Sequence, residues 1–314
     1  MKTIRHLLPL FILHFLLCAG SAAAADSVTV RTRKSGTAIR VVTVNIRVPS
    51  PKDYNTGNGW DQRRELCRDV LLAQDADIFC FQECRHTQLG FVKEKMPGFE
   101  HFAVDNSIKE GAPPEPTIAI LYSTGRFKKV RAGGFWLSGT PAVPGSRFEG
   151  STYPRLSNWV LLQDRKTGRE IIVWNTHLHH LGGAAGDAVR EKQIAVLLEH
   201  AGKIPGEVPQ ILAGDFNTSG QSGTVKAVKA AGWTDTYPAI HGPANPGPTF
   251  HGFVGEKTKG KNRIDFIFAS SRLRATAAEI IRDSRDGRYP SDHYFVSAEL
   301  EYETAPQTKD TPSK

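Results

Sequence analysis

Short apolar segments rich in branched residues recur along most of this chain, and they constrain its fold more than any other feature. Segments of this kind, bounded by glycine, proline and polar residues, predict β-strands. They are residues 41–46, 77–82, 117–122, 159–163, 171–175, 210–213, 264–269 and 294–300. Two other stretches carry apolar residues at helical spacing, 61–74 and 187–201, the second with Asp187 as its expected N-cap. Strands therefore dominate, and their spacing allows two sheets packed face to face with helices outside, an α/β architecture.

The N-terminus predicts export. Lys2 and Arg5 precede a short apolar run over residues 7–17, and small residues follow at Ala22–Ala25. This order is that of a cleaved signal peptide, and the run is too short to span a bilayer comfortably. We therefore expect residues 1–25 to be removed and the mature protein to be secreted or periplasmic.

The rest of the chain is expected to form one domain, since no linker is long enough to divide it. We expect a flexible leader at 26–38, a catalytic domain at 39–302 and a disordered tail at 303–314. Surface loops rich in proline and glycine are expected at 49–60, 105–116, 139–155 and 242–262. We expect a monomer with no stable membrane span.

Charge and cysteine content are less informative. The formal net charge is +8, and loss of Lys2 and Arg5 with the signal leaves +6. This excess suits polyanionic partners but is also common in exported proteins without them. Three cysteines then remain, Cys67, Cys80 and Cys84, without the spacing of a zinc site. An odd number leaves at least one thiol unpaired, and Cys67 and Cys80 are expected to be buried as small hydrophobic residues.

Polar residues capable of chemistry stand where the expected strands end. A single aspartate at a strand end is most often a cap or a solvated turn, but the repetition along this chain is harder to dismiss. Asp265, between Ile264 and Phe266, is costly to bury without a partner, and His293 is the natural candidate. The residues of this pattern are Asn45, Glu83, His177, Asp215, Asn217, Asp265, Asp292 and His293.

The order of these motifs resembles the endonuclease/exonuclease/phosphatase superfamily, whose members have the DNase I-like fold. The motifs are Thr-Val-Asn-Ile-Arg, Phe-Gln-Glu-Cys-Arg, Asn-Thr-His-Leu, Gly-Asp-Phe-Asn, Arg-Ile-Asp-Phe-Ile and Ser-Asp-His. Residues 135–138, 249–253 and 287–293 resemble an exported bacterial branch. The resemblance covers residues 40–300. It implies a four-layer α/β sandwich, two packed and mainly antiparallel sheets flanked by helices, with the site at one edge of both sheets.

The resemblance also implies a metal site. Glu83 corresponds to the principal ligand, with Asn45 and Asp292 nearby. These are hard oxygen donors of the kind that Mg²⁺ prefers, and Mn²⁺ and Ca²⁺ are alternatives.

Catalytic roles follow from the same resemblance. Asp215 would orient or deprotonate the attacking water with help from Asn217, which would also donate to the phosphoryl oxygens, as would His177. Asp265 would fix His293 and raise its pKa, because a nearby anion favours the charged form. The expected substrate contacts are Arg85, Tyr122 and Arg155.

Two positions depart from the family pattern. His179 follows the catalytic His-Leu where related sequences often carry an acidic residue, and it is expected to be a local variation rather than a substrate or metal contact. The carboxylate that commonly supports His177 is not evident after Tyr122, so the partner of His177 stays open.

These features predict metal-dependent hydrolysis of a phosphoester, most readily a phosphodiester, by attack of water. A nuclease is favoured, partly for Arg147 and Arg155 in one loop and for Lys257, Lys259, Lys261 and Arg263 in another, although a solvated loop explains the latter equally well. The alternatives are a secreted phospholipid, sugar-phosphate or other small-molecule phosphoesterase and, less favoured, a non-catalytic binding protein on the same fold.

Overall fold

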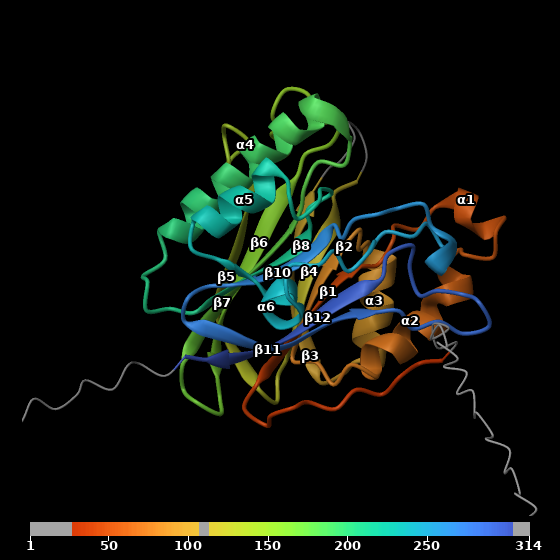
Figure 1. Cartoon of the computed structure of the whole chain (residues 1–314), viewed down its shortest axis with the longest axis horizontal. Helices are drawn as coiled ribbons and strands as arrows, with labels where there is room; N and C mark the ends of the chain where they lie inside the picture. Colours follow the sequence, from red (N-terminus) through yellow and green to blue (C-terminus); the bar gives the residue numbers. More distant parts are fainter. Residues whose placement is uncertain (1–26, 107–112, 304–314) are drawn as a thin grey trace, which may run out of the picture.

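The computed structural model describes residues 27–106 and 113–303, so the expected signal peptide and residues 304–314 lie outside the described residues. The described chain forms two sheets of six strands each (Figure 1). The first sheet, in spatial order, is β11 (Leu273–Ile281), β12 (Phe295–Tyr302), β1 (Ile39–Asn45), β2 (Ile78–Gln82), β4 (Glu115–Ser123) and β3 (Phe99–Asn106). The second is β5 (Phe127–Trp136), β6 (Leu156–Asp164), β7 (Glu170–His177), β8 (Gln210–Asp215), β10 (Asp265–Ala269) and β9 (Thr234–Asp235).

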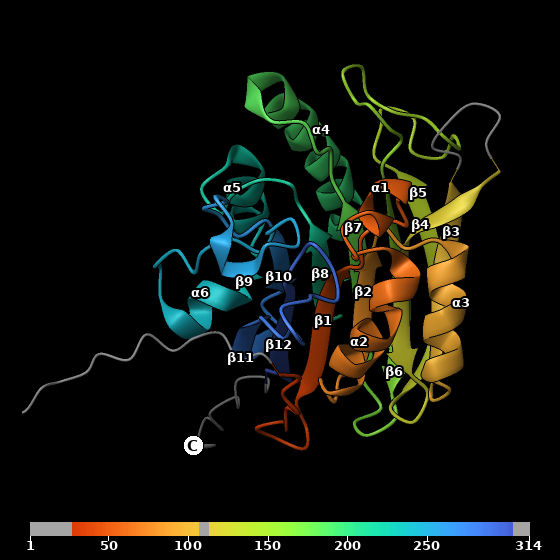
Figure 2. The ribbon, with the colours of Figure 1, turned by 90° about the vertical axis from the view of Figure 1, so that its right-hand side faces the viewer.

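Helices cover the outer face of each sheet, so the expected α/β sandwich of the DNase I-like type is confirmed. Helices α2 (Trp60–Leu72) and α3 (His86–Lys95) pack on the first sheet through a shared apolar cluster. Helices α4 (Gly183–Gly202) and α5 (Gly223–Ala230) cover the second sheet in the same way. Figure 1 shows the two pairs on opposite sides of the sheets, and Figure 2 shows α2 and α3 side by side. The remaining helical segments are short: α1 (Pro51–Tyr54), α6 (Thr236–His241) and a 3₁₀ turn at Gly255–Lys257.

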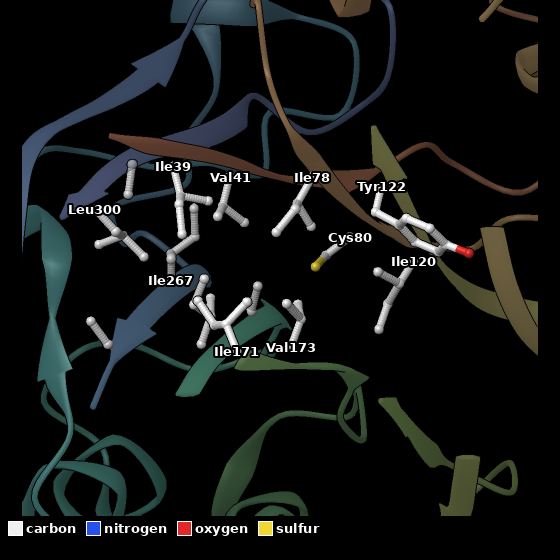
Figure 3. Close-up of a cluster of buried hydrophobic side chains, with 14 of the residues drawn as sticks. Ile39, Val41, Ile78, Cys80, Ile120, Tyr122, Ile171, Val173, Ile267 and Leu300 are labelled. Carbon is white, nitrogen blue, oxygen red and sulfur yellow. The ribbon is translucent and has the colours of Figure 1, made fainter. Parts of the chain in front are cut away.

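Alternate side chains of a strand pack into the apolar clusters on the two faces of its sheet. In β1, Ile39 and Val41 point into the cluster between the sheets, whereas Val42 and Val44 point toward α2 and α3. Successive side chains of a strand face opposite sides, so one apolar run fills two interiors. Figure 3 shows the inter-sheet cluster, in which Cys80 lies among branched aliphatic residues.

Strand direction brings the ends of distant segments to one edge. β1 pairs in parallel with β2, and β7 pairs in parallel with β8. The carboxyl ends of these central strands therefore meet at the same edge of their sheets. β10 and β12 run antiparallel to β8 and β1, so it is their amino ends that reach this edge.

Several elements were not expected from the sequence. Strands β3 and β5 lie at the edges of their sheets, and residues 128–131 of β5 are exposed, so polar positions replace the apolar alternation. Residues 51–54 of one expected loop are helical. Helix α4 begins at Gly183 with Gly182 as its N-cap. The expectation of Asp187 as N-cap is therefore wrong; Asp187 lies inside the helix and pairs with Arg190 three residues on.

Residues 27–38, expected to form a flexible leader, contact the domain at several points. Arg31 pairs with Glu279 at 2.7 Å and with Asp283 at 2.8 Å. Arg33 pairs with Asp77 at 2.7 Å. These ion pairs and a backbone hydrogen bond from Arg31 to Ala73 attach the leader to the domain.

The three cysteines of the domain are unpaired and buried, as expected for Cys67 and Cys80. Burial raises the pKa of Cys67 to about 12 and raises the pKa values of Cys80 and Cys84 further. Within residues 27–106 and 113–303, the helices are too short or too polar to cross a membrane.

Candidate active site

The common edge of the two sheets gathers the polar residues that end the central strands. Asn45 ends β1 and donates from Nδ2 to Asp215, which ends β8 in the other sheet, at 2.9 Å. The same amide lies 3.4 Å from Glu83, directly after β2. One asparagine therefore joins the carboxylates of both sheets.

A carboxylate–histidine pair lies at the centre of this group. His293 Nδ1 is 3.0 Å from Asp265 Oδ2, the contact that the sequence predicts, and both side chains are buried. Burial alone would lower the pKa of His293, but Asp265, with Asp215 and Asp292 nearby, raises it to about 10. His293 is therefore a cation at neutral pH and a donor toward an anionic group.

Asp215 lies between the two histidines. Its Oδ2 is 3.4 Å from His177 Nε2 and 3.9 Å from His293 Nε2, and its Oδ1 accepts from the backbone N–H of Asn217 at 2.8 Å. Burial, followed by the charge of Asp265, raises the pKa of Asp215 to about 7. A carboxylate with such a pKa can hold or remove the proton of a water molecule near neutral pH.

His177 differs from His293 in charge state. Burial, then the positive charges of Arg155 and His293, lowers the pKa of His177 well below its ordinary value. Asp215 Oδ2 lies 3.4 Å from His177 Nε2, and the group that would support His177 through its other ring nitrogen stays open. His177 is thus a neutral donor and His293 a charged one.

Two further carboxylates face the same space. Glu83 has a left-handed backbone, with φ of 58°, and its Oε2 accepts from the backbone N–H of Val48 at 2.9 Å. Burial raises the pKa of Asp292. The positive charge of His293 acts against this rise, and the negative charge of Glu83 adds to it. Arg47, itself paired with Asp53, lies 3.6 Å from Asp292. Left-handed backbone conformations at residues other than glycine, as at Glu83, cluster at functional sites.

Two sets of residues could hold a metal ion. In the described part of the chain, ligand atoms of Asp215, Asp265 and His293 lie within 4.8 Å of one another. In that set, His293 Nδ1 is already bound to Asp265 Oδ2. Glu83 and Asp292, with Asn45 beside them, offer oxygen donors and a like-charge repulsion that a divalent cation would relieve. The residues present therefore fit a divalent metal at the position that the sequence analysis assigns.

One cavity of 570 Å³ is lined by Glu83, His177, Asp215, Asn217, Asp292 and His293. Asn45 and Asp265 are not part of its lining. Arginines and aromatic rings complete its wall. Arg155 lines the cavity, and its buried Nε has no hydrogen-bond partner among the described residues. Arg85 also lines the cavity and lies 3.9 Å from Glu115. The lining residues that the sequence analysis did not single out include Arg47, Thr117, Tyr153, His180 and Phe250. Loops carry most of them, and strand patterns give no signal for such positions.

The expected substrate contact of Tyr122 is wrong. β4 runs antiparallel to β2, and Tyr122 pairs with Ile78 at the opposite end of the sheet from Glu83. The Tyr122 ring is buried in the core between the sheets, and its hydroxyl donates to Glu100 at 2.6 Å. Thr117, near the start of the same strand, lines the cavity instead.

The basic loop is also smaller than the sequence indicates. Arg263 is buried and pairs with Asp235 at 2.6 Å, so it is not available to a nucleic acid. Lys257, Lys259 and Lys261 are exposed and do not line the cavity. His179 is buried, and its backbone, rather than its ring, makes the recorded hydrogen bonds to Gln193 and Arg190.

A two-sheet sandwich with carboxylates, amides and a carboxylate-bound histidine at the shared edge suits the hydrolysis of phosphoester bonds. The chain belongs to the Endonuclease/Exonuclease/phosphatase family, whose model matches residues 42–293. Members of this family act on phosphate-containing substrates, including nucleic acids, and generally depend on divalent metals.

Solved structures support the assignment over nearly the whole fold. A family protein from Bacteroides thetaiotaomicron is 30% identical, with a TM-score of 0.76 over 85% of this chain and 99% of that one. A mannosyl-6-phosphatase from the same organism is also 30% identical, with a TM-score of 0.74 over 84% of this chain and 100% of that one.

Sequence relatives are more distant. The Ccr4 3'-5'-exoribonuclease subunit of the CCR4-Not complex from Yarrowia lipolytica is 27% identical over 52% of this chain. The match spans only 29% of the Ccr4 subunit's own length.

Proposed function

We propose that this chain hydrolyses a phosphoester by attack of water, with a divalent cation bound by Glu83, Asp292 and Asn45. The observation that carries the proposal is the gathering of two unlike histidines and three carboxylates on one cavity. A bound cation would neutralise charge on the phosphoryl oxygens, and Mg²⁺ is the proposed ion.

The chain's own residues divide the remaining work. Asp215, held by Asn45 and Asn217, orients the water and takes its proton. His293, kept charged by Asp265, and His177, a neutral donor, bind the phosphoryl oxygens where negative charge develops. Water is the proposed nucleophile, and Asp215 is placed to take its proton.

A sugar phosphate is the first candidate substrate. It is supported by the 30% identity to a mannosyl-6-phosphatase whose whole length is matched. The cavity of 570 Å³ is large enough to hold such an ester.

Nucleic acid, favoured by the sequence, is the second candidate. It is supported by the similarity to the Ccr4 exoribonuclease subunit and by the exposed Lys257, Lys259 and Lys261. Because residues 1–25 carry the pattern of a signal peptide, we propose that either substrate is met outside the cytoplasm.

A substrate panel tests the proposal. Purified protein would be assayed on hexose 6-phosphates, nucleotides, DNA and RNA with Mg²⁺, Mn²⁺ or Ca²⁺, and again with a chelator. We expect phosphate release or cleavage that requires the cation and disappears in Asp215→Asn. Turnover that survives complete chelation would contradict the metal site, and inactivity on every phosphoester would contradict the function.

A further inference from the structure

Two aromatic side chains from separate loops stack on each other at the wall of the cavity. Tyr153 lies in the connection between β5 and β6, and His180 lies in the connection between β7 and α4. Their ring centroids are 5.7 Å apart, with an interplanar angle of 21°, and both residues line the cavity. Tyr153 is half-buried and His180 is exposed, so the pair presents ring surface that the protein does not cover.

Arg155 links this pair to the reacting centre. Its Nη2 lies 3.5 Å from His180 Nδ1, and its charge acts directly on His177. Its Nε is buried without a partner in the described part of the chain. An anionic group held between His177 and Arg155 would therefore place its substituent against Tyr153 and His180.

Resting on the function proposed above, we propose that the Tyr153–His180 pair binds the ring of the alcohol esterified to the scissile phosphate. The shared chemistry is a sugar or nucleoside ring, which can lie flat on an aromatic surface. An open-chain alcohol has no such face and gains little from the pair. The pair thus selects ring-bearing phosphoesters over open-chain ones of equal charge.

The chemical state of the pair is consistent with stacking. Burial, followed by the charge of Arg155, lowers the pKa of His180, so its imidazole is neutral at neutral pH. A neutral ring stacked on a phenol offers a surface of low charge beside the cationic Arg155. The phosphate would therefore lie beside the cationic Arg155, and its substituent would lie beside the two uncharged rings.

The test compares ring-bearing and open-chain phosphates. Kinetics and, with the metal chelated, calorimetric binding would be measured for glucose 6-phosphate, adenosine 5'-monophosphate and glycerol 3-phosphate. The variants are Tyr153→Ala, His180→Ala and Tyr153→Phe, with Tyr54→Ala as the control, because Tyr54 is exposed and does not line the cavity. Loss of one stacking surface should weaken the ring-bearing ligands about 10-fold and leave glycerol 3-phosphate unchanged.

The outcomes separate this inference from the proposed function. Tyr153→Phe should behave as wild type, because it keeps the ring and loses only the hydroxyl. An equal loss on all three ligands, or wild-type binding of glucose 6-phosphate and adenosine 5'-monophosphate no tighter than that of glycerol 3-phosphate, would overturn the inference. If none of the three ligands is hydrolysed, the binding measurements still decide the role of the pair, and the wider substrate panel decides the proposed function separately. If the pair increases the affinity for only one of the two ring-bearing ligands, that ligand identifies the ring that the pair prefers.

Discussion

His293 Nδ1 lies 3.0 Å from Asp265 Oδ2, and this contact joins the first residue of β10 in one sheet to a residue two positions before β12 in the other. The pair therefore exists only when the two sheets are packed in register. Asp265 has one oxygen on His293, while its other oxygen has no partner among the described residues. Through this hydrogen bond Asp265 keeps His293 charged, and its own charge also raises the pKa of Asp215.

The first prediction concerns this pair. Asp265→Asn and His293→Ala should each lower kcat by about 10²- to 10⁴-fold, because both remove the charged donor. The double variant should be little slower than the poorer single variant, since residues that act as a unit lose activity non-additively. Steady-state kinetics on any hydrolysed phosphoester measures this, with circular dichroism to verify folding. Losses that multiply would show that the two residues act separately.

The second prediction concerns Glu83. Glu83→Gln keeps the size of the side chain and one acceptor oxygen for the backbone of Val48, but removes the charge that a cation needs. We expect the Mg²⁺ concentration for half-maximal activity to rise and kcat to fall at least about 10²-fold, while thermal unfolding without metal is unchanged. Asp61→Asn is a matched control, because Asp61 is exposed and does not line the cavity. An unchanged metal requirement in Glu83→Gln would contradict the proposed ligand set.

The third prediction concerns stability at the end of β2 away from the site. Arg126 is buried between Asp77, beside the first sheet, and Asp164, at the end of β6 in the second, at 3.1 and 3.2 Å. Arg126→Met leaves two buried carboxylates without their common partner, which should cost about 3–5 kcal/mol of unfolding free energy. Chemical denaturation measures the loss. Arg165→Met, an exposed neighbour, should change stability little; equal effects of the two variants would contradict the role of Arg126.

Strand patterns predicted the site better than the loops around it. Asn45, Glu83, His177 and Asp215 follow apolar strands, and a strand must deliver its last residue to a sheet edge. The direction of each strand was not available from the pattern. Tyr122 was assigned from the family resemblance, and it lies far from the site because β4 is antiparallel to β2 and carries its last residues to the opposite edge.

Other errors have local physical causes. The edge strand β5 lacks apolar alternation because Lys128 and Lys129 face solvent. The sequence gives no sign of the contacts of the leader, because the acidic partners of Arg31 and Arg33 are distant in sequence. Tyr153 and His180 come together through two loops, and no spacing rule connects them.

The fourth prediction concerns the pH dependence of stability. His179 is buried, and burial, followed by the charges of His180 and Arg155, lowers its pKa to about 4. In the unfolded chain a histidine binds its proton near pH 6.5, so the unfolded state holds more protons between these values. The free energy of unfolding should therefore fall as the pH drops from about 6.5 toward about 4.

The variant His179→Leu removes this titration. Its free energy of unfolding should fall less steeply with decreasing pH over the same window, as measured by urea denaturation at several pH values. The matched control is His86→Leu at an exposed position, which should keep the wild-type slope. A His179→Leu slope equal to that of wild type would show that His179 takes up its proton equally in both states.

The fifth prediction decides between the two candidate substrates. Lys257, Lys259 and Lys261 are exposed, whereas Arg263 is held by Asp235. If the substrate is nucleic acid and these lysines contact its phosphates, replacing all three by Ala should flatten the dependence of log affinity on log salt by about one unit per lost contact. Hydrolysis of a hexose 6-phosphate should not change, because none of the three lines the cavity.

A matched triple variant of exposed lysines elsewhere, Lys128, Lys129 and Lys166, controls for net charge. If both triple variants flatten the slope equally, the effect belongs to overall charge rather than to this loop. If neither changes it and hexose phosphates are hydrolysed, the exposed lysines are a solvated surface and the sugar phosphate is the better substrate.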